Sequence, residues 1–225
     1  MRLWSVLVIA ACSRRVPPAR ESPSVPVAAI EPAALCVTMG QIAGTRVDAP
    51  TFRAVAAAHA GDAASLRFSV HGDSTEHRAL ASGQLRRQLG LKLRAADGCN
   101  LVYVMWRRDP TPGIEVSVKR NPGAHTGKQC GNAGYTKLAP THRGTVPVLD
   151  DGREHELRAE ITGDVLAAWI DGALAWQGSL PDSARDLAGA PGVRSDNLAF
   201  DIAAFAVDER AGSDAHAKCR TDDGE

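Results

Sequence analysis

The stretch GREHELRAEITGDVLAAWIDGALAWQG, from Gly152 to Gly178, decides the fold. Between Arg153 and Thr162 apolar and charged residues alternate, and this period of two is typical of a strand with one buried face. Gly163-Asp164 and Asp171-Gly172 interrupt the alternation. Asp-Gly is a strong hairpin signal because a type I′ turn needs positive φ at both central positions. The stretch therefore predicts three antiparallel strands joined as a meander.

Two-residue loops at both interruptions set the register of this meander and the face on which each side chain lies. The predicted opposing pairs are Leu157 with Ile170, Ile161 with Leu166, Ile170 with Ala173, Trp169 with Leu174, and Ala167 with Trp176. One face is predicted to join the core: Leu157, Ala159, Ile161, Leu166, Ala168 and Ile170. The other carries Glu156, Arg158, Glu160, Trp169 and Trp176. A slip of one residue at Gly163 would instead bury Trp169.

Length and composition exclude several classes of protein. The 225 residues suffice for one domain with a full core. The net charge is zero, so no basic footprint indicates a nucleic-acid partner. No apolar run reaches the roughly 18 residues of a membrane-spanning helix. We expect a monomer.

The N-terminus resembles a bacterial lipoprotein signal. Arg2 precedes an apolar run that ends in Ile9-Ala10-Ala11-Cys12, which is similar to the lipobox. The resemblance implies that Cys12 is lipidated and anchors the protein in a bacterial cell envelope, with membrane contact only through the lipid. A plain secretory signal, giving a periplasmic or secreted form, and a buried strand with an ordinary cysteine remain alternatives.

Five prolines between Ser13 and Pro32 predict an extended tether. The expected organisation is a signal peptide over residues 1–11, a tether over 12–34, a β-domain over 35–208 and a polar tail over 209–225. Four further cysteines form no CxxC pair and therefore favour two disulfides in an exported domain. Of three connectivities we favour Cys99–Cys130, across a local hairpin region, and Cys36–Cys219, which would join the ends of the domain.

The rest of the domain consists of short strand-like runs separated by turns. Asn100 to Arg107 is almost continuously apolar, which predicts a central strand buried on both faces. In the run after it, Ile114, Val116 and Val118 alternate with polar residues. No stretch has a convincing period of 3.6 residues. The pattern predicts an all-β sandwich of two antiparallel sheets.

Two stretches, HELRAEITGDVLAAWIDGALAWQG and GAPGVRSDNLAFDIAAFAVD, resemble the C-terminal half of a concanavalin A-like jelly roll. They are nearest to the laminin-G-like domains and the keto-disaccharide hydrolase family. The shared features are Ile170-Asp171-Gly172, the segment from Gly192 to Asn197, and the closing strand from Phe200 to Val207. The resemblance covers about residues 66–208. It implies the fold and leaves the function open, because these features are turns and core positions.

Glu154, Glu156 and Glu160 are the candidate catalytic residues. Their spacing resembles the E-x-D-x-x-x-E signature of laminarinase-like hydrolases, with Glu156 in place of Asp. Alternate strand positions lie about 7 Å apart, which suits a pair of carboxylates cleaving a glycosidic bond. The aromatic flanks of the signature are missing, and a solvated charged face is the competing interpretation.

Trp169 and Trp176, beside Arg158 and Glu160, are the candidate ligand-binding residues. Flat aromatics next to hydrogen-bonding charges hold sugar rings by stacking and hydroxyl contacts. The alternatives are two core tryptophans, or an arginine covering Trp169 as a cation–π pair.

Other chemistry is sparse. Asp201 lies where several jelly-roll proteins bind a structural calcium, so the resemblance makes it a weak candidate ligand; no other cofactor is expected. The histidines lack metal-ligand spacing, and His155 is predicted to be a packing residue. We predict a non-catalytic binding module for carbohydrate or an envelope polymer. The alternatives are a glycoside hydrolase and a structural envelope protein with no small ligand.

Overall fold

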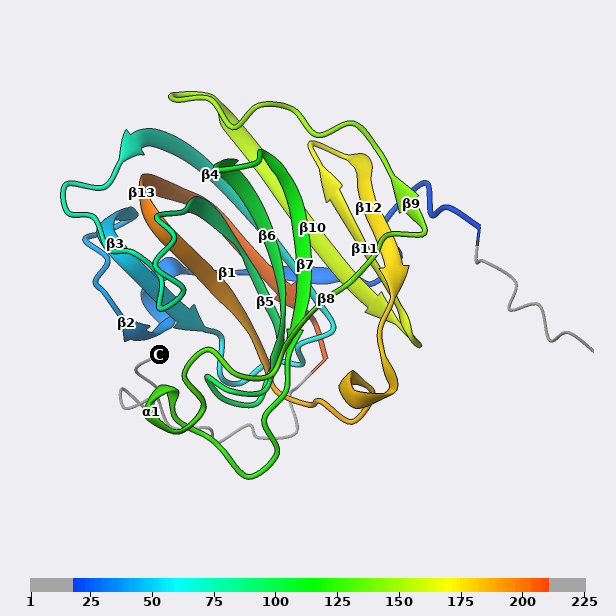
Figure 1. The fold of residues 1–225 in the computed structure, drawn as a ribbon. Coiled ribbons are helices and arrows are strands. Elements are labelled where there is room, and N and C mark those ends of the chain that lie inside the picture. The colour runs from blue at the N-terminus through cyan, green and yellow to red at the C-terminus, as the bar shows by residue number, and fades with distance from the viewer. Residues whose placement is uncertain (1–17, 211–225) are drawn as a thin grey trace, which may run out of the picture.

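The computed structural model describes residues 18–210 and is almost entirely β-structure (Figure 1). Its only helical elements are three short turns, η1 (Pro32–Ala34), α1 (Gly127–Cys130) and η2 (Asp182–Ala184). No helix in the described part of the chain is long and apolar enough to cross a membrane. The strands are β1 (Val27–Ile30), β2 (Cys36–Met39), β3 (Arg46–Val55), β4 (Ala63–Asp73), β5 (Arg87–Ala95), β6 (Leu101–Asp109), β7 (Gly113–Lys119), β8 (Tyr135–Lys137), β9 (His142–Arg143), β10 (Glu154–Thr162), β11 (Val165–Ile170), β12 (Ala173–Ser179) and β13 (Ala190–Asp208).

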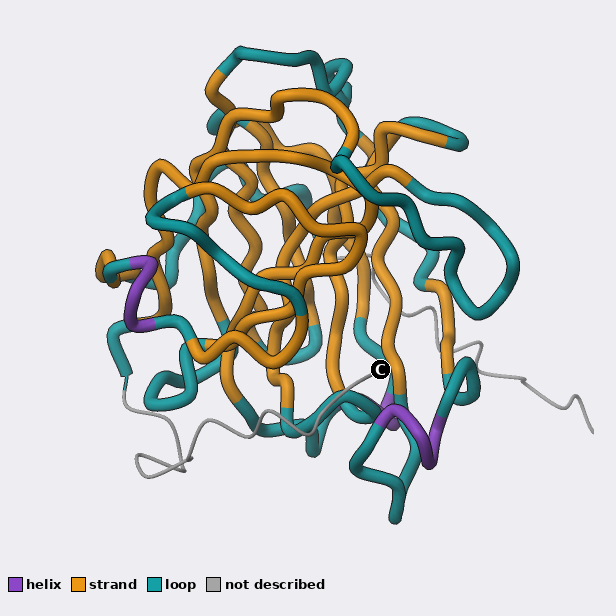
Figure 2. Tube along the Cα trace, turned by 90° about the vertical axis from the view of Figure 1, so that its left-hand side faces the viewer, coloured by secondary structure: helices purple, strands orange, loops and turns teal. Residues whose placement is uncertain are grey.

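The strands form two layers that are joined by one long strand. The first part of β13 pairs with β5 and β3, and its later part pairs with β4 and β1. One layer therefore runs β8-β7-β6-β5-β13, with β3 and β2 beside it, and the other runs β13-β4-β10-β11-β12-β9. Every pairing between strands is antiparallel. The predicted all-β sandwich is confirmed, with its two sheets continuous through β13. Figure 2 shows that strands make up most of the body of the molecule and that loops connect them at its top and bottom.

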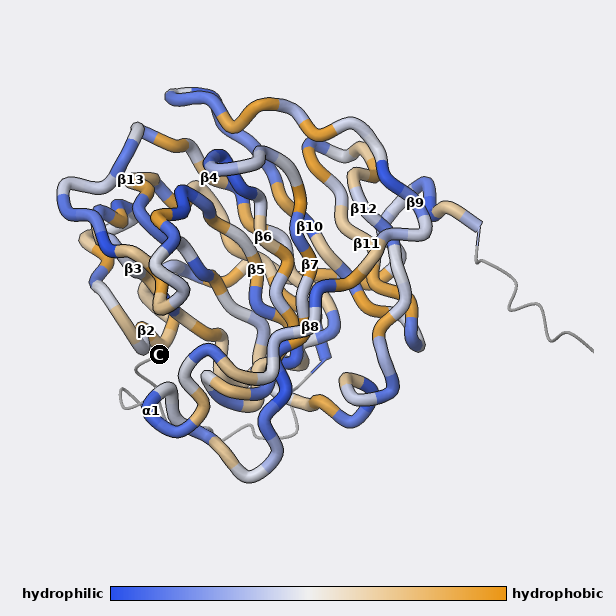
Figure 3. The backbone as a smooth tube through the Cα atoms, viewed as in Figure 1, coloured by the Kyte–Doolittle hydropathy of each residue, from blue (hydrophilic) through white to orange (hydrophobic). Residues whose placement is uncertain are grey.

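A single apolar core fills the space between the layers. Figure 3 shows hydrophobic and hydrophilic positions interspersed along the strands that enclose it. Phe68 of β4 meets the ring of Trp106 of β6 edge to face, with ring centroids 5.9 Å apart. His155 lies fully buried against Trp106, and its ring nitrogens contact Asp171 and Asp150 at 2.8 and 3.0 Å. The prediction that His155 packs within the fold is thus confirmed.

The meander has the predicted register between its first two strands. Leu157 lies opposite Ile170 and Ile161 opposite Leu166. The Asp171-Gly172 loop has φ values of 50° and 81°, as a type I′ turn requires. The pairing with β12 is as predicted next to the turn, with Ile170 opposite Ala173 and Trp169 opposite Leu174, but an irregularity between Ala168 and Trp169 shifts the register beyond it.

That shift corrects the prediction for Trp176. It pairs with Ala168 instead of Ala167 and joins the main core. The ring lies close over Gly178, where a Cβ would come within 2.5 Å of it. A bulge reverses the face on which later residues of a strand lie, and simple alternation cannot anticipate it.

The ordered fold begins earlier than the sequence predicted. Val27 to Ile30 form β1, which pairs with the end of β13 from Asp208 to Phe205. Residues 18–25 lie against the outer face of the meander through hydrogen bonds described below. The tether predicted over residues 12–34 is therefore wrong for residues 18–34, which belong to the folded unit. Cys12 and the signal peptide lie outside the described residues.

The predicted Cys99–Cys130 disulfide is present, with Cα atoms 5.9 Å apart. Cys36 is buried in β2. Its predicted partner, Cys219, lies outside the described residues, so that pairing stays a prediction.

Candidate functional site

The sugar-binding face predicted on the meander is not available to a ligand. Trp169 and Trp176 are only 1% and 2% exposed. Trp176 lies in the core, and Trp169 lies on the outer face beneath residues of the chain itself. Neither ring can stack on a sugar, so this prediction is wrong.

The N-terminal segment occupies that face by binding its polar residues. The Glu160 carboxylate accepts hydrogen bonds from the backbone N–H groups of Ser24 and Val25, each at 2.9 Å, and pairs with Arg20 at 2.7 Å. Arg158 donates to the Val25 carbonyl. Both charged residues therefore serve to hold the segment in place.

The other candidate carboxylates are already engaged on the surface of the same strand. Glu154 pairs with Arg67 across the sheet, and Glu156 accepts a hydrogen bond from the Ser65 hydroxyl. Neither residue lines the pocket over β5–β7 described below or the two smaller pockets beside β7 and β12. The competing interpretation, a charged outer face, fits this arrangement, and the hydrolase hypothesis loses its candidates.

Asp201, the weak candidate calcium ligand, contacts two basic side chains in the structure. Its carboxylate contacts His71 Nε2 at 2.7 Å and lies 4.0 Å from Arg46. Within residues 18–210 no group of three or more histidine, cysteine or acidic side chains could hold a metal.

A well-formed pocket lies on the opposite layer, over the outer faces of β3, β5, β6, β7 and β13. Its volume is about 530 Å³, within the range of roughly 300–1,000 Å³ typical of small-molecule sites. Its lining residues are Met39, Thr51, Arg53, Arg78, Ala79, Leu80, Ala81, Ser82, Arg86, Gln88, Tyr103, Met105, Glu115, Ser117, Lys119, Gly131, Asn132, Tyr135, Lys137 and Arg194.

The alternation of side chains along β6 and β7 determines which residues form the pocket floor. On β7, Ile114, Val116 and Val118 point into the core, so Glu115, Ser117 and Lys119 point outward. On β6 the same alternation places Tyr103 and Met105 on the outer face. Both residues belong to a small second apolar cluster. The central strand predicted to be buried on both faces is thus confirmed, and its outer face is the pocket floor.

A stack of rings and cations forms one side of the pocket. Tyr103 and Tyr135 lie nearly parallel, at 18°, with ring centroids 6.1 Å apart. The Arg194 guanidinium lies 4.6 Å from the centre of the Tyr103 ring, and Lys119 Nζ lies 5.2 Å from that of Tyr135. Tyr135 is 40% exposed and is the aromatic surface that a ligand can reach.

A buried ion network lies beneath the floor. The Asp196 carboxylate binds Arg53 at 2.8 Å, Gln88 at 2.7 Å and Arg194 at 3.1 Å. Burial by itself would raise the pKa of Asp196, but the charges of Arg194 and Arg53 outweigh it and lower the pKa to about 2. The network fixes the orientation of both arginines.

Glu115 is the only carboxylate among the residues that line this pocket. It contacts Lys137 at 2.6 Å, Arg107 at 2.7 Å and Arg86 at 3.3 Å. Burial opposes its ionisation, yet the hydrogen bonds from Lys137 and Arg107 prevail and lower its pKa. Glu115 is therefore ionised at neutral pH.

Asn197 holds one wall of the pocket, the loop over residues 78–86. Its side chain accepts a hydrogen bond from the backbone N–H of Arg78 and donates to the carbonyls of Arg78 and Arg86. Its φ of 56° is a left-handed conformation that asparagine tolerates better than most residues. The Ser195-Asp196-Asn197 segment thus organises both the floor and a wall.

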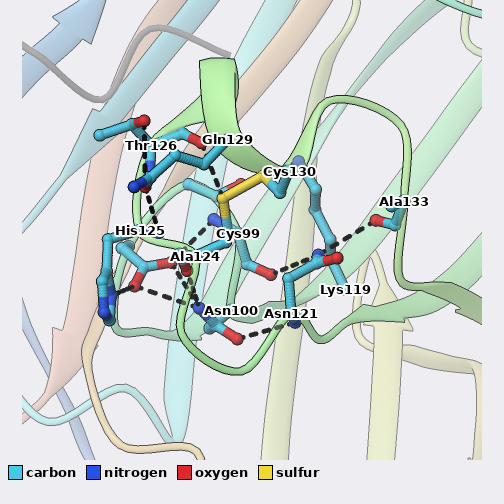
Figure 4. Close-up of a disulfide and its surroundings, with 12 residues drawn as sticks. Cys99, Asn100, Lys119, Asn121, Ala124, His125, Thr126, Gln129, Cys130 and Ala133 are labelled. Atoms are coloured by element: carbon cyan, nitrogen blue, oxygen red, sulfur yellow. Dashed lines mark hydrogen bonds and ion pairs between the residues drawn. A yellow bond between two sulfur atoms is a disulfide. The ribbon is translucent and has the colours of Figure 1, made fainter.

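The disulfide holds the opposite wall (Figure 4). Asn121 donates to the carbonyls of Cys99 and Ala133, so it links the two arms that the disulfide joins. Lys119 donates to the carbonyl of Gly98 at 3.0 Å. These bonds fix the segment that leads to Tyr135 and Lys137 in β8.

Sequence reasoning missed this pocket although two signals for it were present. The polar residues that alternate with Ile114, Val116 and Val118 include two charges on a face next to the central strand. That central strand carries Tyr103 on the same face. The prediction relied on the tryptophans of β11 and β12, but aromatic content alone does not distinguish a binding surface from a core.

No family model and no curated protein matches this chain. Among solved structures, carbohydrate-binding module CBM66 from Bacillus subtilis is similar, with a TM-score of 0.52 at 12% identity, covering 75% of this chain and 91% of that one. The fold is a concanavalin A-like jelly roll. A Crh5 transglycosylase (TM-score 0.47, 10% identity, 81% of this chain, 83% of that one) and a tetrameric galectin from Cinachyrella sp. (0.42, 12%, 65%, 91%) are more distant. At such identities the likeness establishes the jelly-roll fold and no activity.

Proposed function

We propose that this protein is a non-catalytic carbohydrate-binding module whose ligand binds in the pocket over β6 and β7. The observation that carries the proposal is the exposed Tyr135 ring at the edge of an aromatic stack, beside a polar floor. A sugar ring offers a C–H face for stacking and hydroxyls for hydrogen bonds, and this pocket supplies partners for both. The similar structure described as a carbohydrate-binding module gives further support.

Absence of catalysis follows from the protonation states of the pocket carboxylates. Glycoside cleavage needs a carboxylic acid with a raised pKa and a second carboxylate across the scissile bond. Here the pKa values of Glu115 and Asp196 are both lowered, and Asp196 is fully buried. Neither can donate a proton near neutral pH.

We also propose that the module is carried on a bacterial cell envelope through lipidated Cys12, with a soluble periplasmic or secreted form as the rival. The lipobox-like sequence is the basis for this placement. Mass spectrometry of the membrane fraction is the test. A lipid-modified N-terminal Cys12 supports the anchored form, and an unmodified N-terminus in the soluble fraction supports the rival.

A glycan array run beside a hydrolysis screen tests the proposed function. We expect saturable binding without turnover, and binding about tenfold weaker in Tyr135→Ala. Val148→Ala, an apolar side chain 74% exposed outside the pocket, is the matched control and should bind normally. Turnover by the wild type, or undiminished binding by Tyr135→Ala, contradicts the proposal.

A further inference from the structure

Two smaller pockets lie beside the pocket over β5–β7, where β7 begins. Their volumes are about 210 and 180 Å³. The residues that line both are Pro112, Gly113, Ile114, Arg143 and Trp176. Because of this shared lining the two form one depression, which we call the edge groove. Its larger part shares Glu115 and Lys137 with the pocket over β5–β7, so the groove continues that pocket towards β9 and β12.

The edge groove exists because the pairing of β7 with β8 stops early. β8 pairs with the second half of β7, and the Leu138 N–H then donates to the Val116 carbonyl at 2.9 Å. If this register continued, Pro140 would come to lie opposite Ile114. Proline has no N–H to donate, so the ladder ends there. The first half of β7 is therefore an edge that β8 leaves unpaired.

The far side of the groove is fixed to the other layer of the sandwich. The Thr141 N–H donates to the Gln177 carbonyl at 2.7 Å, and the Gly144 N–H donates to the Ala175 carbonyl at 3.0 Å. Only glycine fits at position 144, since a Cβ there would lie 2.0 Å from the Leu174 carbonyl oxygen. The segment that includes β9 is thus held against β12, and the groove has one firm side on each layer.

The groove offers hydrogen-bonding groups that suit the hydroxyls of a sugar. Backbone groups two residues apart on a strand point to the same side, so the N–H and C=O of Ile114 face the unpaired edge, as the Val116 carbonyl faces Leu138. Arg107 also lines the groove and is 7% exposed. Its guanidinium contacts Glu115 at 2.7 Å, yet its Nε has no hydrogen-bond partner among the described residues. A buried donor in this state is unfavourable, and a hydroxyl oxygen can accept from it.

The pocket and the groove meet at an ion pair. Lys137 contacts Glu115 at 2.6 Å, so a donor and an acceptor lie side by side at the junction. Along β7 the two cavities together are lined from Gly113 to Lys119, a rise of about 20 Å at the usual spacing of a strand. One sugar ring cannot cover this length, whereas a chain of several rings can.

We infer that the ligand of this protein is an oligosaccharide that lies in the pocket at one end and in the edge groove at the other. The inference rests on the proposed function and adds a second subsite and a minimum chain length. Each ring of an oligosaccharide carries hydroxyls, which matches donors and acceptors spread along β7. A peptide adding a strand fits less well, because only Ile114 presents both backbone groups to the unpaired edge.

Calorimetric titration of the full chain with linear oligosaccharides of two and six units tests this inference. The probes come from whichever of the glucose, mannose, arabinose and fructose series binds best on the glycan array. A six-unit chain contains five overlapping two-unit stretches, so sliding along the pocket improves its affinity by at most about fivefold. We expect the six-unit probe to bind about thirtyfold more tightly than the two-unit probe, because contacts in the groove add to those in the pocket.

Arg143→Gln and Arg153→Gln form a matched pair of variants. Both arginines are exposed, but only Arg143 lines the edge groove. We expect Arg143→Gln to weaken the six-unit probe about fivefold, the loss of roughly one hydrogen bond, and to leave the two-unit probe unchanged. Arg153→Gln should bind both probes as the wild type does. Tyr135→Ala should weaken both probes, because both occupy the pocket.

The outcomes separate the two proposals. If the six-unit probe binds only about fivefold more tightly than the two-unit probe, or less, the edge-groove inference is overturned and the carbohydrate module stands. Arg143→Gln also overturns the inference if it weakens both probes equally or leaves the six-unit probe unchanged. If neither probe binds and the glycan array is also empty, the proposed function fails with it.

Discussion

The outer face of β10–β12 and the outer face of β5–β7 have the same sequence pattern. In the structure, residues 18–25 lie against the first face, whereas the second face forms the floor of a pocket. Both carry aromatic rings among alternating charges. On β10–β12 the protein's own segment around Ser24 and Val25 satisfies Glu160 and Arg158 and buries Trp169. On β5–β7 the pocket lies open between two walls. The comparison teaches that a polar, aromatic face remains a candidate site only where no described segment of the chain covers it.

The largest expected effect concerns the ion network beneath the pocket. In Asp196→Asn the buried Arg53 and Arg194 lose the negative charge of Asp196, which should lower the free energy of unfolding by about 3–5 kcal/mol. Urea denaturation measures the change. Asp201→Asn, which alters a partly exposed carboxylate on the other part of β13, is the control and should unfold nearly as the wild type.

Glu160→Gln probes the covered face. One charge is lost where the carboxylate accepts two backbone N–H groups and pairs with Arg20, so we expect a loss of about 1.5–3 kcal/mol in unfolding free energy. Sugar affinity should stay at the wild-type value, because Glu160 lies outside the pocket. Reduced affinity in a variant that remains folded would show that the two faces are coupled.

Acid should weaken the pocket floor over a defined range. The Asp196 pKa of about 2 lies below its ordinary value of 3.8, so the folded state favours the ionised form. Its contribution, about 2 kcal/mol, is fully present above pH 4 and is lost as the pH falls towards 2. Unfolding free energies measured across this range should show the decline in the wild type. Asp196→Asn should lack this component of the decline.

The smallest effect is expected at Glu154. Its pairing with Arg67 is exposed, so Glu154→Gln should leave the unfolding midpoint unchanged within error. Sugar binding should also be unchanged. If the wild type cleaved sugars and this variant did not, the hydrolase hypothesis for β10 would regain support.

The sequence predicted those parts of the structure that depend on neighbours along the chain. Alternation and the Gly163-Asp164 turn identified the register of β10 and β11, and the pairing of Cys99 with Cys130 was also correct. The face of Trp176 depended on a bulge, which no local pattern encodes. The engagement of Glu160 on the face that carries Trp169 depended on a segment about 135 residues away, at Ser24 and Val25.

Only individual residues of the pocket could be predicted, because the pocket also depends on contacts between distant parts of the chain. It draws Arg53, Gln88, Tyr103, Lys119 and Arg194 from five strands. Each fragment is visible as an outward-facing polar position, but their meeting depends on the order of strands in the sheet. The Gly192–Asn197 segment was recognised as a mark of the fold, whereas Asp196 and Asn197 also hold the floor and a wall of the pocket.

The long strand β13 has a consequence for how the molecule is made. It lies between β5 and β3, so Gly192 pairs with Val55 from an early part of the chain. Such distant pairings are slow to form, because a large loop must close before any contact compensates for it. During synthesis the early strands cannot complete their pairing until residues 190–208 have been made. The same segment supplies Arg194 and Asp196 to the pocket. The pocket is therefore completed in the step that closes the sheet, and a nascent chain lacking β13 has only part of the pocket.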